Sequence, residues 1–217
     1  MIPLKDDIPT NSTPYVTIGI IILNSLIFFY QLFLGYSEEY FIRQFGLIPS
    51  YLFYGDIYGQ NHFVPLITYQ FLHGGFMHII GNMLFLWIFG NNIEDALGHL
   101  KFIVFYLSSG IAGGIAHSFL QSSSLLPLIG ASASVSGVLG AYLFLFPKAR
   151  VSTLFFIFFF IQIIKIPAIV FIVLWFIIQI INVPSGESVA YLAHIGGFLT
   201  GIILILLMKK RTGYARY

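Results

Sequence analysis

Long apolar stretches recur along the whole chain, and they constrain its fold more than any other feature. A helix needs about 20 predominantly apolar residues to cross the hydrocarbon core of a bilayer. Of the 217 residues, 58% are hydrophobic and 8% are charged, whereas soluble domains are about 45–50% apolar and about 25% charged. The sequence therefore predicts an all-α membrane protein with several spans.

Apolar length, Gly and Pro punctuation and the polarity of the loops predict six spans. They are Val16–Leu34, Phe76–Phe89, Phe102–Phe119, Ala133–Phe146, Ala168–Ile181 and Tyr191–Met208. The second and fourth are short for a full crossing, which suits helices that stop beneath a water-filled cavity. We expect one six-helix domain over residues 15–208, between a cytoplasmic segment 1–14 and a basic cytoplasmic tail 209–217.

Two segments outside these spans are also apolar or aromatic. The run Leu154–Ile164 is too short to span, so we expect it at the membrane interface. The long loop between the first two spans, residues 35–70, is rich in Tyr and Phe. Aromatic side chains favour the headgroup region, which predicts an interfacial segment on the outer side.

The basic residues predict the orientation of the bundle. With a cytoplasmic N-terminus, nine of the ten Lys and Arg residues lie inside and only Arg43 lies outside. This is the asymmetry of the positive-inside rule. The sequence therefore predicts that both termini are cytoplasmic, and we expect the plasma membrane as the location.

Charge and cysteine content exclude several classes of function. The formal charge of +2 is too small to indicate nucleic-acid binding, and the absence of cysteine excludes disulfides and thiolate metal sites. No cofactor or metal is expected.

All the carboxylates lie outside the predicted spans, which disfavours a proton-coupled or ion-driven transporter.

Polar residues within the spans meet at one depth. His78 and Asn82 lie four residues apart near the outer end of the second span, and Ser132 and His194 lie at the outer ends of the fourth and sixth. Intramembrane polar residues are functional candidates because burying them unpaired is costly. A serine hydroxyl needs a base to take its proton, so Ser132 and His194 can form a nucleophile–base pair.

Each of these residues also has a simpler interpretation. Either histidine, or Asn82, can be a hydrogen-bond partner between helices, and Ser132 can be a packing residue or an N-cap. Because these four residues are expected at one depth in the membrane, a shared functional site is the favoured interpretation. Glu187 is a less favoured third member that would orient His194. Small residues at Ser134, Ser136, Gly137, Gly140 and Ala141, and at Ala193, Gly196, Gly197 and Gly201, would let the fourth and sixth spans approach closely.

Five motifs occur in order between about residues 65 and 201. They are His73-Gly74-Gly75-Phe76-Met77-His78-Ile79-Ile80-Gly81-Asn82-Met83, Gly90-Asn91-Asn92-Ile93-Glu94-Asp95-Ala96-Leu97-Gly98, Gly130-Ala131-Ser132, Ser136-Gly137-Val138-Leu139-Gly140-Ala141-Tyr142 and Ala193-His194-Ile195-Gly196-Gly197-Phe198. In this order and spacing, they resemble the rhomboid intramembrane serine proteases. The resemblance implies transmembrane proteins as substrates, which are cut near the outer membrane face.

The resemblance also implies a role for each candidate residue. Ser132 would attack, His194 would act as general base and acid, and His78, Asn82 and the Ser132 N–H would stabilise the oxyanion. The segment containing Glu94 resembles a structural motif of the family, without chemistry. Lateral substrate access would lie beside the fifth span, with Phe171, Trp175 and Phe176 as a gate.

One departure from the family pattern leaves alternatives open. The residue after the nucleophile is usually Gly, and here it is Ala133, which would be unfavourable at a positive φ. A rival register makes Ser136, followed by Gly137, the nucleophile. A catalytically inactive rhomboid-like binding protein and, more remotely, a small-solute transporter are the alternative functions.

Peptide hydrolysis needs water, so the outer ends of the second, fourth and sixth spans should border a polar cavity. We expect His73, Gln121 and Ser122–Ser124 at its rim.

Overall fold

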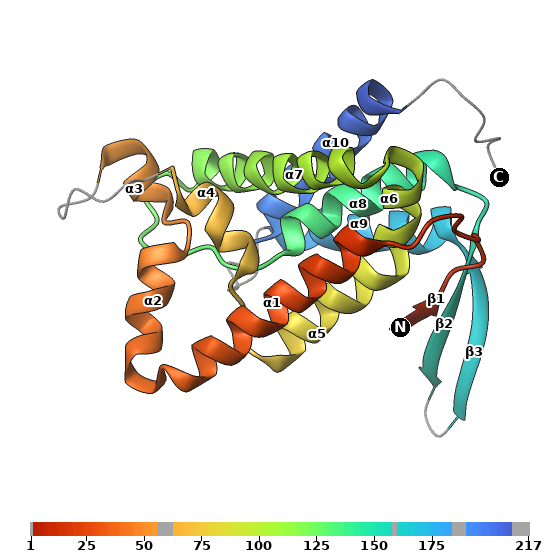
Figure 1. The fold of residues 1–217 in the computed structure, drawn as a ribbon, viewed down its shortest axis with the longest axis horizontal. Coiled ribbons are helices and arrows are strands. Elements are labelled where there is room, and N and C mark those ends of the chain that lie inside the picture. The colour runs from red at the N-terminus through yellow and green to blue at the C-terminus, as the bar shows by residue number, and fades with distance from the viewer. Residues whose placement is uncertain (1, 56–62, 158–159, 184–189, 210–217) are drawn as a thin grey trace.

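A computed structural model describes residues 2–55, 63–157, 160–183 and 190–209, and most of these are helical. The elements follow in the order β1 (Ile2–Lys5), α1 (Tyr15–Phe33), η1 (Gly35–Ser37), α2 (Glu38–Phe45), α3 (Pro49–Tyr54), α4 (Pro65–Thr68), η2 (Tyr69–Phe71), α5 (Phe76–Phe85), η3 (Leu86–Gly90), α6 (Asn91–Leu97), α7 (His99–Leu120), α8 (Ser132–Leu145), β2 (Arg150–Ile157), β3 (Phe160–Pro167), α9 (Ala168–Asn182) and α10 (Tyr191–Met208). Figure 1 shows the long helices gathered into one bundle, with a small sheet at one end.

All six predicted apolar segments are helical, with differences at their ends. Among the described residues, four helical stretches are long and apolar enough to cross a membrane: Tyr15–Phe33, Phe76–Leu97, His99–Leu120 and Tyr191–Met208. The other two, α8 and α9, have 14 and 15 residues. The shortness of the fourth predicted span is therefore confirmed, whereas a full crossing by all six helices stays a prediction.

The second predicted span is longer than expected. The helix does not stop at Phe89, because a π-helical segment, η3, joins α5 to α6 and carries the helix on to Leu97. Glu94 and Asp95 therefore belong to a potential membrane span. The expectation that every carboxylate lies outside the spans is wrong for these two residues.

Small residues bring three helix backbones into contact at the centre of the bundle. Gly197 of α10 faces the carbonyl oxygen of Ala133 in α8, and Gly201 faces that of Gly137, so closely that a Cβ at either glycine would overlap the oxygen. Gly113 of α7 faces the carbonyl oxygen of Ala193, and a Cβ there would lie 2.5 Å from it. The predicted close approach of the fourth and sixth spans is confirmed, and it includes the third.

A buried carboxylate fixes the start of α1. Glu94 is fully buried and accepts hydrogen bonds from the backbone N–H groups of Val16 and Thr17 at 2.9 and 2.7 Å, and from the Thr17 hydroxyl at 2.7 Å. Its Oε1 also lies 2.6 Å from Nδ1 of His99. The first N–H groups of a helix lack partners within the helix, and an anion is favoured there by the helix dipole. Glu94 thus joins α1 to α6 and α7.

Residues 150–167 correct the all-α prediction. They form the antiparallel hairpin β2–β3, to which β1 adds as a third strand in the order β1-β2-β3. The uninterrupted apolar run in this region suits a strand as well as a helix, because periodicity alone does not distinguish them. Its β-branched residues favour the strand.

The N-terminal segment is attached to the C-terminal part of α8 and to the start of β2. Asp6 accepts a hydrogen bond from the Tyr142 hydroxyl at 2.5 Å, and Asp7 accepts one from the backbone N–H of Arg150 at 2.7 Å. Burial raises the pKa of Asp6 to about 6, although the hydrogen bond from Tyr142 opposes the rise. The two hydrogen bonds of Asp6 and Asp7 hold β1 beside the hairpin.

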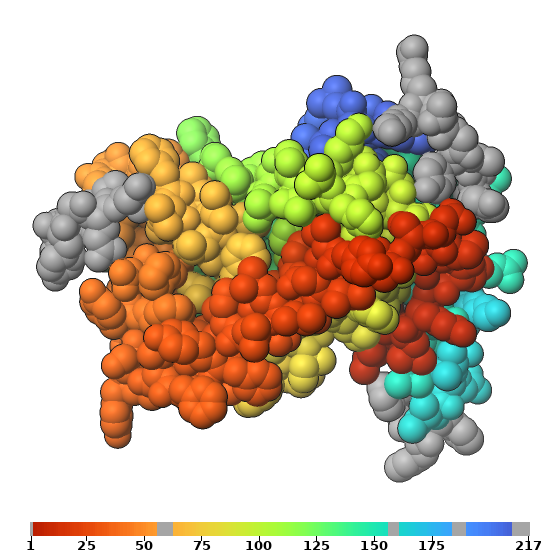
Figure 2. Space-filling model, viewed as in Figure 1, coloured from red at the N-terminus to blue at the C-terminus, as the bar shows by residue number. Residues whose placement is uncertain are grey.

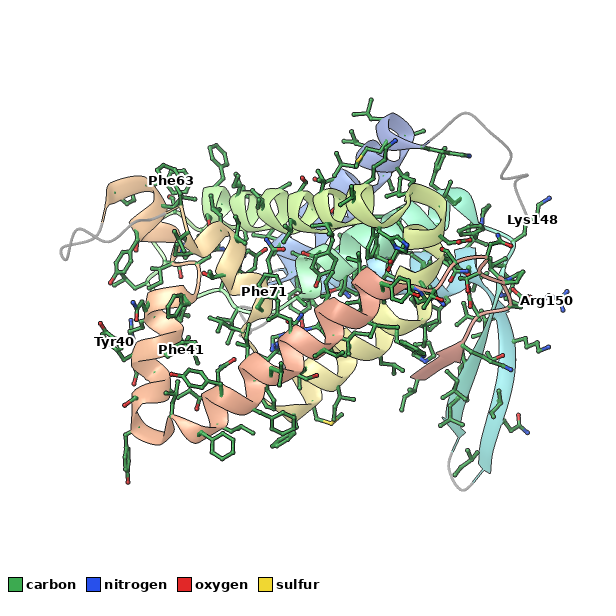
Figure 3. All side chains as sticks on the ribbon, viewed as in Figure 1. Tyr40, Phe41, Phe63, Phe71, Lys148 and Arg150 are labelled. Atoms are coloured by element: carbon green, nitrogen blue, oxygen red, sulfur yellow. The ribbon has the colours of Figure 1, made fainter. Side chains whose placement is uncertain are left out.

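The two ends of the bundle differ in composition. Tyr40, Phe41 and Phe63 lie at one end, and Lys148 and Arg150 lie at the other, beside the sheet (Figure 3). Between α1 and α5 the predicted outer loop contains the short helices α2, α3 and α4, and a β-bridge between Leu47 and Leu128 ties it to the segment before α8. The segment with α2 and α3 and the β2–β3 hairpin protrude at opposite ends of α1 (Figure 2).

We predict that Glu94→Ala strongly destabilises the protein, because it leaves buried N–H groups of α1 without an acceptor. Loss of one partner of a buried charged network typically costs about 3–5 kcal/mol. Thermal unfolding in detergent measures the effect. Glu39→Ala is the matched control, because Glu39 forms an exposed ion pair with Arg43 at 3.2 Å, and such helix pairs contribute about 0.3–0.5 kcal/mol. Equal losses in the two variants would contradict the assigned role of Glu94.

Candidate active site

Ser132 and His194 are in direct contact at the N-terminal ends of α8 and α10. Ser132 is the first residue of α8, and His194 lies in the first turn of α10. The Ser132 Oγ is 2.8 Å from Nε2 of His194, and the His194 side chain is buried. The contact follows from the packing of Gly197 against Ala133. Ala133 comes one residue after Ser132, and Gly197 comes three residues after His194.

Gln179 of α9 is the second partner of His194. Its Oε1 lies 2.8 Å from Nδ1 of His194, and its Nε2 donates to the Trp175 carbonyl oxygen at 3.0 Å. Because the amide nitrogen donates to a carbonyl, the amide oxygen faces the imidazole and accepts from Nδ1–H. The remaining nitrogen, Nε2, is then unprotonated and accepts from the Ser132 hydroxyl.

Sequence reasoning missed Gln179. The available signal was that Gln179 is the only polar residue between Ala168 and Ile181. The same cost of intramembrane polarity that singled out the histidines applies to it. Glu187, the third member considered from the sequence, lies outside the described residues.

A cavity of about 750 Å³ opens beside the Ser132–His194 pair. His78 and Asn82 of α5 line it together with Ser132 and His194. The Asn82 Nδ2 is buried and has no hydrogen-bond acceptor within the described part of the chain. The four residues singled out from the sequence thus border one space.

Gly130 makes room for the His78 ring. Its φ is +123°, and a Cβ there would lie 2.6 Å from Nε2 of His78. The Gly130 N–H donates to the Tyr69 carbonyl oxygen at 2.9 Å, which fixes the turn before α8. Only glycine meets both the backbone and the steric requirement at this position.

The expected rim residues are elsewhere. His73 is fully buried, its N–H donates to Gln31 Oε1 at 3.0 Å, and its carbonyl oxygen accepts from Gln31 Nε2 at 3.1 Å. Burial, and next the neighbouring His78, lowers the pKa of His73 to about 3, so its ring is neutral at physiological pH. Gln121 and Ser122–Ser124 do not line the cavity either, where Pro127, Leu128 and Ile129 do. Polarity alone did not indicate which loop residues face the cavity.

Ala133 fits the fold without strain. It lies within α8, so the position after Ser132 is helical and does not need a positive φ. A Cβ at Gly113 would lie 2.8 Å from the Ala133 methyl, so this glycine leaves the space that the methyl occupies.

Ser136 is fully buried and donates its hydroxyl to the Ser132 carbonyl oxygen at 2.6 Å. It does not line the cavity.

The three proposed gate residues differ in position. Trp175 lines the cavity, and its ring centroid lies 6.2 Å from that of His194. Phe176 stacks on Phe198 at 4.3 Å. Phe171 is buried against Phe85 and Phe89. Of these three, Trp175 alone borders the site.

This arrangement has the parts needed for nucleophilic chemistry. A neutral imidazole accepts from a serine hydroxyl, a third side chain holds the imidazole, and an amide donor lies across the cavity. A nucleophile, a base and a group that orients the base are the elements of activated serine sites.

Residues 60–211 match the family model described as "Rhomboid domain". The chain is 31% identical over 149 residues to Rhomboid protein 1, mitochondrial, of Saccharomyces cerevisiae, an alignment that covers 64% of this chain and 40% of that protein. It is 33% identical over 156 residues to RHOMBOID-like protein 6, mitochondrial, of Arabidopsis thaliana, covering 70% and 46%. Rhomboid protease GluP of Bacillus subtilis is 34% identical over 149 residues, covering 67% and 26%. The chain thus spans less than half the length of each of these relatives.

Proposed function

Because the chain belongs to the rhomboid family, we propose that it is an intramembrane serine endopeptidase that cuts transmembrane proteins near the outer membrane face. The observation that carries the proposal is the 2.8 Å contact between the Ser132 hydroxyl and the His194 imidazole at the edge of a cavity. The alternative, an inactive rhomboid-like binding protein, drew its support from Ala133. That support is weak, because Ala133 lies within a regular helix.

The first proposed step is acylation of Ser132. His194 Nε2 takes the hydroxyl proton while Oγ attacks the scissile carbonyl carbon, whose oxygen becomes negatively charged. Asn82 Nδ2, His78 and the Ser132 N–H would donate to this oxygen. The protonated His194 then gives its proton to the leaving amine, and the peptide bond breaks.

The second proposed step is hydrolysis of the acyl-enzyme. Water gives a proton to His194 Nε2 and attacks the ester carbonyl, and the proton returns to Ser132 Oγ as the acid product leaves. The cavity beside the pair provides a place for this water. Gln179 would keep Nε2 directed at the reacting oxygen in both steps.

The proposed orientation places both termini and the sheet on the positively charged side of the membrane. The outer ends of α5, α8 and α10, with the cavity, are then on the opposite side. The expectation of the plasma membrane gains no support from the relatives, because two of those compared have mitochondrial names. The proposal is therefore limited to an integral membrane protein of this orientation.

We predict that Ser132→Ala and His194→Ala each lower cleavage of a model transmembrane substrate in liposomes by at least about a thousandfold, because nucleophile and base act as one unit. The double variant should be no slower than either single variant. Ser136→Ala is the matched control and should retain activity. Activity in Ser132→Ala with loss in Ser136→Ala would establish the rival register.

We predict that Asn82→Ala slows turnover by roughly ten- to a thousandfold, since removal of one oxyanion donor typically costs up to that amount. The Ser132 N–H and His78 would remain to share the charge. Asn24→Ala on α1 is the matched control, because its Nδ2 donates only to Ile20 of its own helix among the described residues. Unchanged turnover with a lower melting temperature in Asn82→Ala would show a purely structural role.

We predict that Gln179→Leu lowers kcat with little change in KM, because the imidazole loses the acceptor that fixes its tautomer. Removing groups that orient a functional histidine costs roughly ten- to a hundredfold at metal sites, and we expect a loss of that order. In Gln179→Glu, the carboxylate would stabilise imidazolium, so the acidic limb of the rate profile should move to higher pH. Gln121→Leu is the control at an exposed glutamine. A pH profile unchanged in Gln179→Glu would exclude the positioning role.

A further inference from the structure

The three-stranded sheet carries an apolar row beside a basic row on one of its faces. Directly paired residues of neighbouring strands point to the same side of a sheet. Ile2 and Ile163 both pair with Leu154, and Lys5 and Lys165 both pair with Ser152. The shared partners, Ser152 and Leu154, lie two apart on β2 and so point to the same face. Both rows therefore lie on one side of the sheet.

The apolar row is largely uncovered. Ile163 is 63% exposed and Ile2 40% exposed, and Ile161, two residues along β3 on the same face, is 67% exposed. Apolar side chains gathered at an exposed sheet edge in water favour association with another apolar surface. This face therefore needs an apolar partner.

The basic row has few acidic neighbours. Lys5, Lys165 and Arg150 are exposed, and none of them forms an ion pair within the described residues. Asp6 and Asp7 follow Lys5 in the chain; Asp6 accepts from the Tyr142 hydroxyl and Asp7 from the Arg150 backbone N–H. The three cations beside these two acids leave a net positive charge, which favours an anionic partner.

The sheet is joined to two apolar helices, at the C-terminal end of α8 and the N-terminal end of α9. β2 begins five residues after α8 ends, and β3 leads directly into α9. The hairpin then runs to one side of the bundle instead of continuing along the direction of α7 (Figure 1). If the ends of α8 and α9 lie at headgroup depth, as their apolar length favours, a hairpin that turns sideways there would follow the membrane surface.

We propose that this face of the sheet binds anionic phospholipids of the leaflet on the side of the chain termini. The isoleucines would enter the boundary between headgroups and acyl chains, and Lys5, Arg150 and Lys165 would contact the phosphates. Basic residues near an anionic membrane surface attract it electrostatically, and buried apolar area adds to the attraction. This surface is separate from the active site, and the proposal does not depend on protease activity.

The chain has no cysteine, so Ile163→Cys allows an environment-sensitive fluorophore to be attached at one position. The whole 217-residue chain is placed in liposomes of phosphatidylcholine alone, or of an equimolar mixture with phosphatidylglycerol. We expect blue-shifted emission and quenching by nitroxide-labelled lipids in the anionic liposomes, with weaker effects in phosphatidylcholine. Ile161→Cys repeats the measurement if the first variant does not fold.

Charge variants separate lipid binding from other causes. Lys5→Gln, Arg150→Gln and Lys165→Gln together should abolish the difference between the two lipid mixtures. Lys101→Gln is the control, because it removes a cation on the same side whose Nζ binds the Met208 carbonyl oxygen. Solvent-like emission in anionic liposomes would overturn the proposal. So would a signal that depends on the protein-to-lipid ratio, which would identify a second copy at the sheet edge as the partner.

Discussion

The backbone contact between α8 and α10 determines the geometry of the site. Glycine at positions 197 and 201 lets one helix approach the carbonyl oxygens of the other, without a side chain between them. Within a membrane, such close packing replaces the hydrophobic effect as the main force between helices. Since Ser132 and His194 lie at the same end of these helices, the packing also determines the distance between Oγ and Nε2.

A second constraint is the need to satisfy polar groups away from water. Glu94 binds the N–H groups of α1, and Gln31 closes a pair of hydrogen bonds with the backbone of His73. The Gln179 amide donates to the Trp175 carbonyl oxygen and accepts from Nδ1 of His194, so the polar groups of both side chains have partners. These contacts connect distant segments of the chain, and they explain how the fold holds a polar site among apolar helices.

The common depth of Ser132, His194, His78 and Asn82 could be predicted from the sequence, because the rise of a helix per residue fixes how far along its axis each residue lies. For Gln179 the sequence offered a signal, a lone polar residue in an apolar span, but not the partner, because depth does not reveal how α9 is rotated toward its neighbours. The sequence was insufficient for the hairpin, because an uninterrupted apolar run lacks the periodicity that distinguishes strand from helix. His73 was misplaced since local polarity does not show which residues of a loop become buried.

The proposed function depends on Ser132 being an activated nucleophile. The most direct measurement is reaction of the detergent-solubilised protein with a fluorophosphonate probe, followed by mapping of the labelled residue. An activated serine reacts because its base takes the hydroxyl proton. We expect labelling at Ser132 that is lost in His194→Ala. Labelling at another serine, or none in the folded native protein, would contradict it.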